Sequence, residues 1–177
     1  MSINLSIKKT YNEKIVKNYV FFTNENFKID ALDKSVVRKF SNQIKKTLNS
    51  SDLKDKEFLS FNLNPSQKII LIKTKNNQSP LENEKKGAKF FNYTKSNSFY
   101  KLSFFEQNIN KIRSGSKYFF DDFVLGLKLK SYVFDKYKTK KNSKTLSLDL
   151  FIKKNKINFN KDKRYTSLIE GLNYTKD

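Results

Sequence analysis

The chain has 177 residues and a formal net charge of +20, and its hydrophobic fraction of 37% argues for one folded domain rather than disorder. Cysteine and histidine are both absent, which excludes disulfides, thiol nucleophiles, histidine-dependent triads and imidazole metal sites. No apolar run has the length of a signal peptide or of a membrane span, so we expect no membrane association and a cytoplasmic location.

Strand patterns dominate the first half of the chain. Alternating or continuous apolar side chains predict strands at Ile3–Lys9, Asn18–Phe22, Phe58–Leu63 and Lys68–Lys73. The aliphatic run at 69–72 is typical of a strand buried on both faces, so we expect Lys68–Lys73 to be the central strand. Apolar positions at helical spacing predict a helix over Asp33–Leu48, with Asp30 or Asp33 as its N-cap.

Helices and strands alternate in the second half of the chain. The predicted elements are a helix at Pro80–Phe91 capped by Ser79, a strand at Phe99–Phe105, a helix at Lys117–Tyr132, a strand at Leu146–Phe151 and a helix over residues 165–172. This order of elements indicates a mixed sheet with helices on both faces, which is an α/β three-layer sandwich. The order of the strands within the sheet does not follow from the sequence.

Two local patterns raise the question of ligand chemistry. Phosphate cradles need glycine after a central strand, but Lys68–Lys73 is followed by Thr74, Lys75 and two asparagines, which disfavours a nucleotide site. Asp121 and Asp122 are neighbours in a predicted helix and point about 100° apart, so they are poorly placed to share one metal ion. We expect both on the polar side of the helix start, where negative charge suits the helix dipole.

The basic charge consists almost entirely of lysine. Of 37 basic residues, only Arg38, Arg113 and Arg164 are arginines, and lysine usage of this kind beside many asparagines is typical of an AT-rich coding sequence. The alternative interpretation is a lysine surface that binds nucleic-acid phosphates without sequence specificity.

Aromatic and basic side chains are interleaved after the helix predicted to end at Tyr132. As a stacking strip for nucleic acid, this segment would combine its aromatic rings with four candidate contacts, Lys136, Lys138, Lys140 and Lys141. In the alternative interpretation, Tyr132, Phe134 and Tyr137 anchor the end of the helix to the core while the lysines are solvated.

The same part of the chain carries a family resemblance. Residues 126–141 read GLKLKSYVFDKYKTKK, and residues 170–177 read EGLNYTKD. In this order they resemble the "GLxLxSY", "YxFDxYKTKK" and "EGxNxTRD" elements of the leucine aminopeptidase (cytosol aminopeptidase) family, with Lys176 in the usual arginine position. The matching positions are Gly126, Tyr132, Phe134, Asp135, Tyr137, Lys138, Glu170, Gly171 and Asp177.

The resemblance implies a domain organisation and a parent enzyme. Residues 1–160 would be the family's N-terminal domain, with a macro-domain-like fold, and residues 161–177 would begin the helix that leads into a catalytic domain. The parent would release N-terminal amino acids from peptides with two divalent ions, zinc or manganese, and would assemble as a hexamer. The family's metal ligands belong to downstream motifs, so the resemblance implies no catalytic residue, metal ligand or cofactor in this chain.

Two departures from the family pattern bear on function. The family's central strand ends in a Gly-x-Gly-like turn, whereas this chain has Lys73, Thr74 and Lys75 there, and the sequence stops at Asp177. The leading hypothesis is therefore a non-catalytic N-terminal domain of a leucyl-aminopeptidase-like metallopeptidase. The alternative is a stand-alone basic domain that binds nucleic acid non-specifically.

Overall fold

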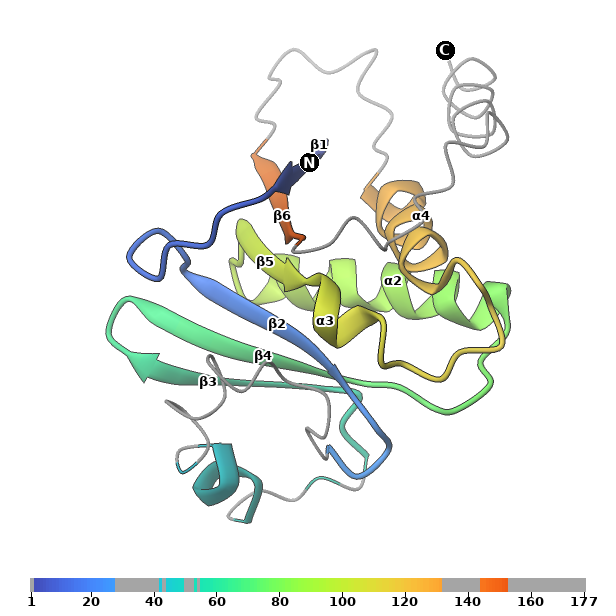
Figure 1. Ribbon diagram of the computed structural model, residues 1–177, viewed down its shortest axis with the longest axis horizontal. Coiled ribbons are helices and arrows are strands. Elements are labelled where there is room, and N and C mark those ends of the chain that lie inside the picture. Colours follow the sequence, from blue (N-terminus) through green and yellow to red (C-terminus); the bar gives the residue numbers. More distant parts are fainter. Residues whose placement is uncertain are drawn as a thin grey trace.

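The computed structural model describes residues 2–27, 42, 44–49, 53, 55–131 and 144–152. These residues form a six-stranded sheet with the strand order β1-β6-β5-β2-β4-β3 (Figure 1). The strands are β1 (Ser2–Lys8), β2 (Asn18–Thr23), β3 (Phe58–Asn64), β4 (Gln67–Lys73), β5 (Lys101–Phe105) and β6 (Thr145–Phe151). Neighbouring strands are parallel except that β3 is antiparallel to β4, so the sheet is mixed, as predicted.

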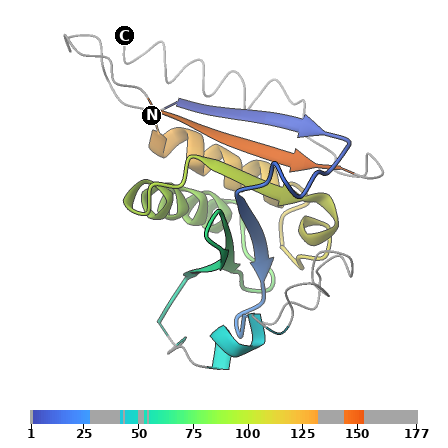
Figure 2. The same cartoon turned by 90° about the vertical axis from the view of Figure 1, so that its left-hand side faces the viewer.

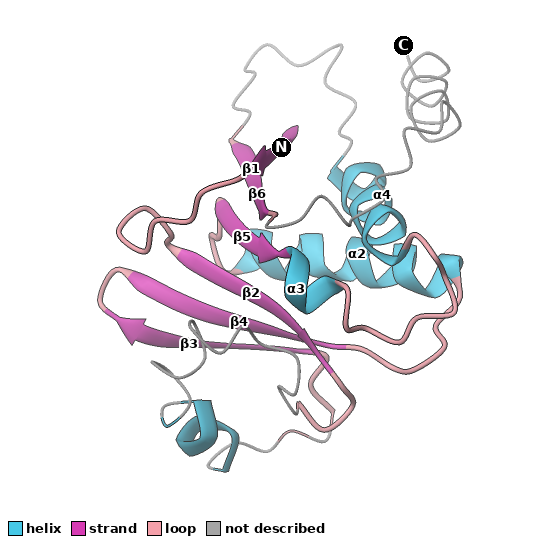
Figure 3. Ribbon diagram, viewed as in Figure 1, coloured by secondary structure: helices cyan, strands magenta, loops and turns pink. Residues whose placement is uncertain are grey.

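Three helices come after β4 in the chain. Two of them lie together on one side of β2 and β4, and the short third one lies directly after β5 (Figure 3). They are α2 (Pro80–Ser96), α3 (Glu106–Ile109) and α4 (Phe119–Ser131). Ser79 caps α2 as predicted, because its hydroxyl accepts from the Glu82 N–H while the Glu82 carboxylate accepts from the Ser79 N–H. α3 was not predicted, since four residues are too few to show helical periodicity.

Two predicted helices fall wholly or partly outside the described residues. Residues 42 and 44–49 are helical, in agreement with the end of the helix predicted over Asp33–Leu48, and the rest of that helix lies outside. The helix predicted over residues 165–172 lies outside as well. Within the described ranges, no helix has the length and apolar character needed to cross a membrane.

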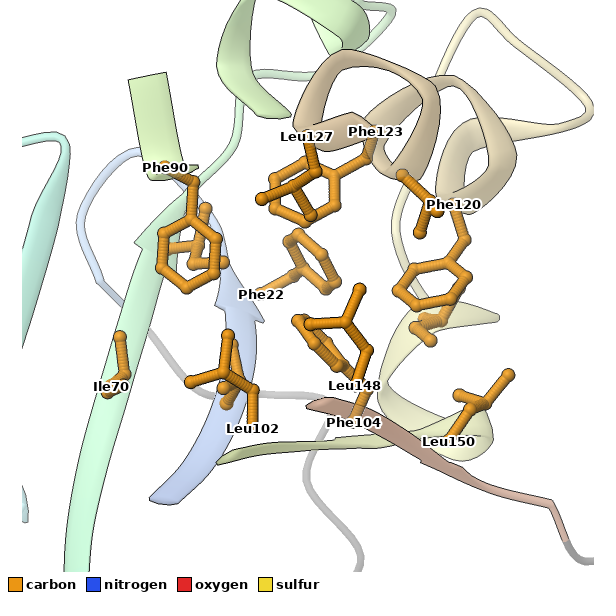
Figure 4. Close-up of a cluster of buried hydrophobic side chains, with 14 of the residues drawn as sticks. Phe22, Ile70, Phe90, Leu102, Phe104, Phe120, Phe123, Leu127, Leu148 and Leu150 are labelled. Carbon is orange, nitrogen blue, oxygen red and sulfur yellow. The ribbon is translucent and has the colours of Figure 1, made fainter. Parts of the chain in front are cut away.

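The larger core lies between the sheet and the helices α2 and α4. Figure 4 shows side chains from β2, β4, β5 and β6 meeting Phe90 of α2 and Phe120, Phe123 and Leu127 of α4. Phe22 lies at its centre, with its ring in edge contact with that of Phe123 at a centroid distance of 5.1 Å. This packing explains the broad apolar face of α4, because one helix contacts both the sheet and α2.

A second core covers the opposite face of the sheet over β2, β4 and β3. Its fully buried members from β2 and β4 include Tyr19, Phe21, Ile69 and Leu71, and Ile44 from the helical residues 44–49 packs against them. Helical residues thus cover both faces, and the α/β class with a mixed sheet is confirmed. Figure 2 shows β1 and β6 side by side along one margin of the sheet, with α4 beneath them.

The strand predicted to be central has the expected burial but another position. Residues 69–72 of β4 are buried on both faces, as their aliphatic run indicated. However, β4 lies one strand from the edge, and β2 and β5 occupy the middle of the sheet. All six residues of β2 are buried, because this strand has neighbours on both edges and a core on each face. The prediction of a central β4 was therefore wrong.

Candidate functional site

Of the nine motif positions named above, the structure describes one, Gly126. It lies in α4, and a Cβ atom added there would collide with the backbone carbonyl of Glu84 in α2. Gly87 of α2 shows the reciprocal relation, since a Cβ there would collide with the carbonyl of Phe123. The two glycines let the helix backbones touch, so Gly126 has a packing role.

The other motif positions and all four candidate nucleic-acid contacts lie outside the described residues. They are Tyr132, Phe134, Asp135, Lys136, Tyr137, Lys138, Lys140, Lys141, Glu170, Gly171 and Asp177. The hypotheses attached to them stay predictions.

The carboxyl ends of the parallel strands are where α/β sheets commonly bind ligands, and here Asn108 fills the gap between two of them. β2 and β5 pair at a single position, Tyr19 with Ser103. Beyond it, the Asn108 side chain takes the place of a strand: its Oδ1 accepts from the Phe22 N–H at 2.7 Å, and its Nδ2 donates to the Phe22 carbonyl at 2.9 Å. Asn108 is 1% exposed, so both bonds are buried.

The turn between β4 and α2 is likewise occupied by the protein's own hydrogen bonds. The Thr74 N–H donates to the Thr23 carbonyl at 2.9 Å, and the Asn77 N–H donates to the Arg113 carbonyl at 2.8 Å. The Lys75 N–H donates to the Gln78 Oε1 at 3.0 Å. At the start of α2, the capping box also engages the N–H groups of Ser79 and Glu82. The prediction that this turn is a poor nucleotide site stays a prediction.

Lys86 is the buried basic group at this end of the sheet. Its ammonium donates to the carbonyl of Lys73 at 2.7 Å, and burial lowers the pKa of Lys86. The positive charges of Lys89, Lys75 and Lys73 lower this pKa further, whereas Glu57 acts against them. The lysine ties α2 to the end of β4.

The two adjacent aspartates of α4 have different environments. Asp122 is 1% exposed and accepts from the Asn83 amide of α2 at 3.3 Å, so the prediction that it lies on the polar side was wrong. Asp122 faces inward because α2 crosses α4 at this turn and supplies a polar partner. Burial, and then the charge of Asp122, raise the pKa of Glu84. Across the described ranges, no group of three or more acidic, histidine or cysteine side chains could hold a metal ion.

A charged pair joins the edge strand β1 to β6. The Asp149 carboxylate accepts from the Lys8 ammonium at 2.8 Å and from the Ser6 hydroxyl at 2.6 Å. Burial acts to raise the pKa of Asp149, but these two hydrogen bonds and the charges of Lys8 and Lys101 together lower it below its ordinary value. The carboxylate is therefore stabilised in the folded chain in its ionised form.

This pair predicts a pH-dependent loss of stability. Because the folded-state pKa of Asp149 is lowered, its contribution is complete above the unfolded pKa of about 4 and disappears as the pH falls through the folded value. We expect Asp149→Asn to lower the free energy of unfolding by about 2 kcal/mol at neutral pH. Urea titrations from neutral to acidic pH should show this difference shrinking below about pH 4. The exposed control Glu25→Gln should show little difference, and a pH-independent deficit in Asp149→Asn would contradict the assignment.

Comparison with known proteins supports the fold. The chain matches no protein-family model and no curated protein. A solved structure of a tomato leucine aminopeptidase mutant is similar, with a TM-score of 0.60 at 14% sequence identity. The likeness covers 96% of this chain and 36% of the tomato chain. At this identity it establishes the α/β fold, and the chain spans little more than a third of the enzyme it matches.

Proposed function

We propose that this chain is the non-catalytic N-terminal domain of a leucyl-aminopeptidase-like metallopeptidase. The observation that carries the proposal is the fold likeness, which covers nearly the whole of this chain but 36% of the aminopeptidase. The sequence motifs around Gly126 and Glu170 add independent support. Two buried polar groups of the described residues, Asn108 and Lys86, bind backbone atoms and so hold the fold together.

In this proposal the N-terminal domain has a structural role, and the catalytic domain carries out the peptide hydrolysis. Two divalent ions, zinc or manganese, would be held by carboxylates and a lysine of the catalytic domain, polarising the peptide carbonyl and activating water. The parent would remove N-terminal amino acids from peptides as a hexamer. The domain described here would support that assembly and access to its active sites.

Peptidase assays on matched chains test this proposal. We expect the 177-residue chain to release no amino acid from a leucyl amide substrate, with or without added zinc or manganese. A chain extended through the downstream reading frame should acquire metal-dependent activity. An extended frame that encodes no aspartate- and glutamate-containing metal motif, or an extended protein inactive with both metals, would contradict the proposal.

The net charge of +20 favours a second candidate function, non-specific binding of nucleic acid. In the described region, an exposed lysine lies over an aromatic ring: the Lys144 ammonium is 4.9 Å from the centre of the Tyr100 ring. Such pairs suit backbone phosphates and base stacking together. This function requires affinity for single-stranded DNA that falls steeply as salt is raised. Failure to retain DNA at about 50 mM salt would exclude it.

A further inference from the structure

β1 is an edge strand, and among the described residues only β6 pairs with it. Figure 2 shows it as the outermost strand of the sheet. The Lys8 carbonyl accepts from the Ile152 N–H at 3.0 Å, so the backbone groups of Lys8 face β6. In a parallel ladder, successive residues direct their backbone groups to opposite sides. The outward-facing N–H and C=O groups therefore belong to Ile3, Leu5 and Ile7.

The side chains of these three residues are all apolar and all point to the helix side of the sheet. Ile3 and Leu5 are partly buried against the larger core. Ile7 continues the same row but is 53% exposed, which makes it one of three large apolar side chains exposed in the described chain. The edge thus offers unpaired backbone groups beside an incompletely covered apolar row.

The sequence of β1 is nearly palindromic about Leu5. Ile3 and Ile7 flank it at equal distances, and the small polar residues Asn4 and Ser6 lie between them. An antiparallel copy placed by a two-fold axis at Leu5 would set Ile3 opposite Ile7 and Leu5 opposite itself. Each facing pair would exchange two N–H···O bonds, because residues with outward backbone groups meet as hydrogen-bonded pairs. A two-fold interface requires this kind of self-complementarity.

The opposite edge strand, β3, is protected against pairing with a further strand, whereas β1 is not. The pairing of β3 with β4 shifts register between Asn62 and Asn64, and such a bulge disfavours pairing with a further strand. β1 pairs with β6 in one unbroken register over its whole length. Its charged residue Lys8 stands at one end, and the rest of the strand is neutral. Of the two edges of the described sheet, only that of β1 is regular over seven residues.

We propose that β1 is a dimerisation edge, through which two copies of this chain join their sheets in antiparallel orientation about a two-fold axis at Leu5. The dimer has a continuous twelve-stranded sheet, since each copy contributes six strands. This inference rests on the edge of β1 alone and does not depend on the aminopeptidase proposal.

The charge of the chain sets how the dimer responds to salt. Two copies that each carry +20 repel one another. Within the interface, however, Lys8 of each copy lies opposite Ser2 of the other, which separates the two lysines by roughly 20 Å along the strands. That distance exceeds the Debye length of about 8 Å at physiological salt. Added salt therefore screens the general repulsion and strengthens the dimer, which is the reverse of its effect on nucleic-acid binding.

Sedimentation velocity of the 177-residue chain over a concentration series, at about 0.1 M and about 1 M NaCl, tests the proposal. We expect a monomer–dimer equilibrium that shifts toward dimer at high salt. Ile7→Lys should raise the dimer dissociation constant about tenfold or more, because the two-fold axis doubles the cost of each substitution. Ile15→Lys is the matched control, since Ile15 is also 53% exposed but belongs to the connection between β1 and β2 and not to the edge strand.

Two further measurements make the assignment specific to the edge. Ile7→Pro removes an outward N–H without removing a bond to β6, so it should weaken the dimer while circular dichroism shows a folded chain. Amide exchange followed by NMR should slow with protein concentration at Ile3, Leu5 and Ile7 and stay unchanged at Asn4 and Ser6. A chain that stays monomeric at both salt concentrations, or a dimer unaffected by both substitutions at Ile7, would overturn the proposal.

Discussion

Replacing Gly126 by alanine should lower the free energy of unfolding by about 3 kcal/mol, although alanine is the better helix former. The new methyl group would collide with the Glu84 carbonyl, which belongs to the backbone of α2 and cannot rotate away. The two helices must then separate and loosen the core that Phe123 and Leu127 share with the sheet. A thermal midpoint lower by roughly 10 °C is the expected readout.

Variants at the same crossing sharpen this test. Gly87→Ala should lower the free energy of unfolding by a similar amount, because its methyl group would collide with the Phe123 carbonyl of α4. A chain with both substitutions should lose less stability than the sum of the two single losses, because one separation of α2 from α4 relieves both collisions. Lys130→Ala on the exposed side of α4 is the control and should change stability by less than about 0.5 kcal/mol. A stabilised Gly126→Ala chain would show that the helices do not meet at these glycines.

The second large effect is expected at Asn108. Asn108→Ala should lower the free energy of unfolding by about 4 kcal/mol, because the N–H and C=O of Phe22 would both remain buried without partners. Urea denaturation measures this loss. The control Asn110→Ala removes an exposed amide from the end of the same short helix and should cost far less.

Asn108→Asp separates the two hydrogen bonds. A carboxylate can accept from the Phe22 N–H but cannot donate to the Phe22 carbonyl, so the folded state favours the protonated acid. The pKa of the introduced group is then raised on folding, and the variant should regain stability as the pH falls below that raised value. Equal stability of Asn108→Asp and the parent chain at neutral pH would show that the hydrogen bond from Asn108 Nδ2 to the Phe22 carbonyl contributes nothing.

Local patterns in the sequence predicted most of the elements because each has a strong periodic signal. The alternation of Leu146, Leu148 and Leu150 predicted β6, and Ser79 with Pro80 predicted the start of α2. Each of these signals lies within one segment of the chain. Element type and approximate bounds could therefore be obtained without the structure.

Features that depend on tertiary arrangement could not be obtained in this way. Nothing near Asn108 indicates that its amide bonds a strand 86 residues earlier in the chain. Gly87 and Gly126 were visible as glycines within helices, but their contact depends on how α2 crosses α4. The inward position of Asp122 and the placement of β4 beside the edge strand β3 likewise follow from packing and strand order. The motif residues beyond Ser131 remain predictions.

The aminopeptidase proposal is tested most directly by determining the length and activity of the protein made from the native gene. Intact mass spectrometry of the polypeptide, captured with an antibody against this domain, gives the length, and a leucyl amide assay with zinc or manganese gives the activity. We expect one polypeptide much longer than 177 residues with metal-dependent aminopeptidase activity. A native polypeptide that ends at Asp177, without activity and without an associated catalytic chain, would contradict the proposal.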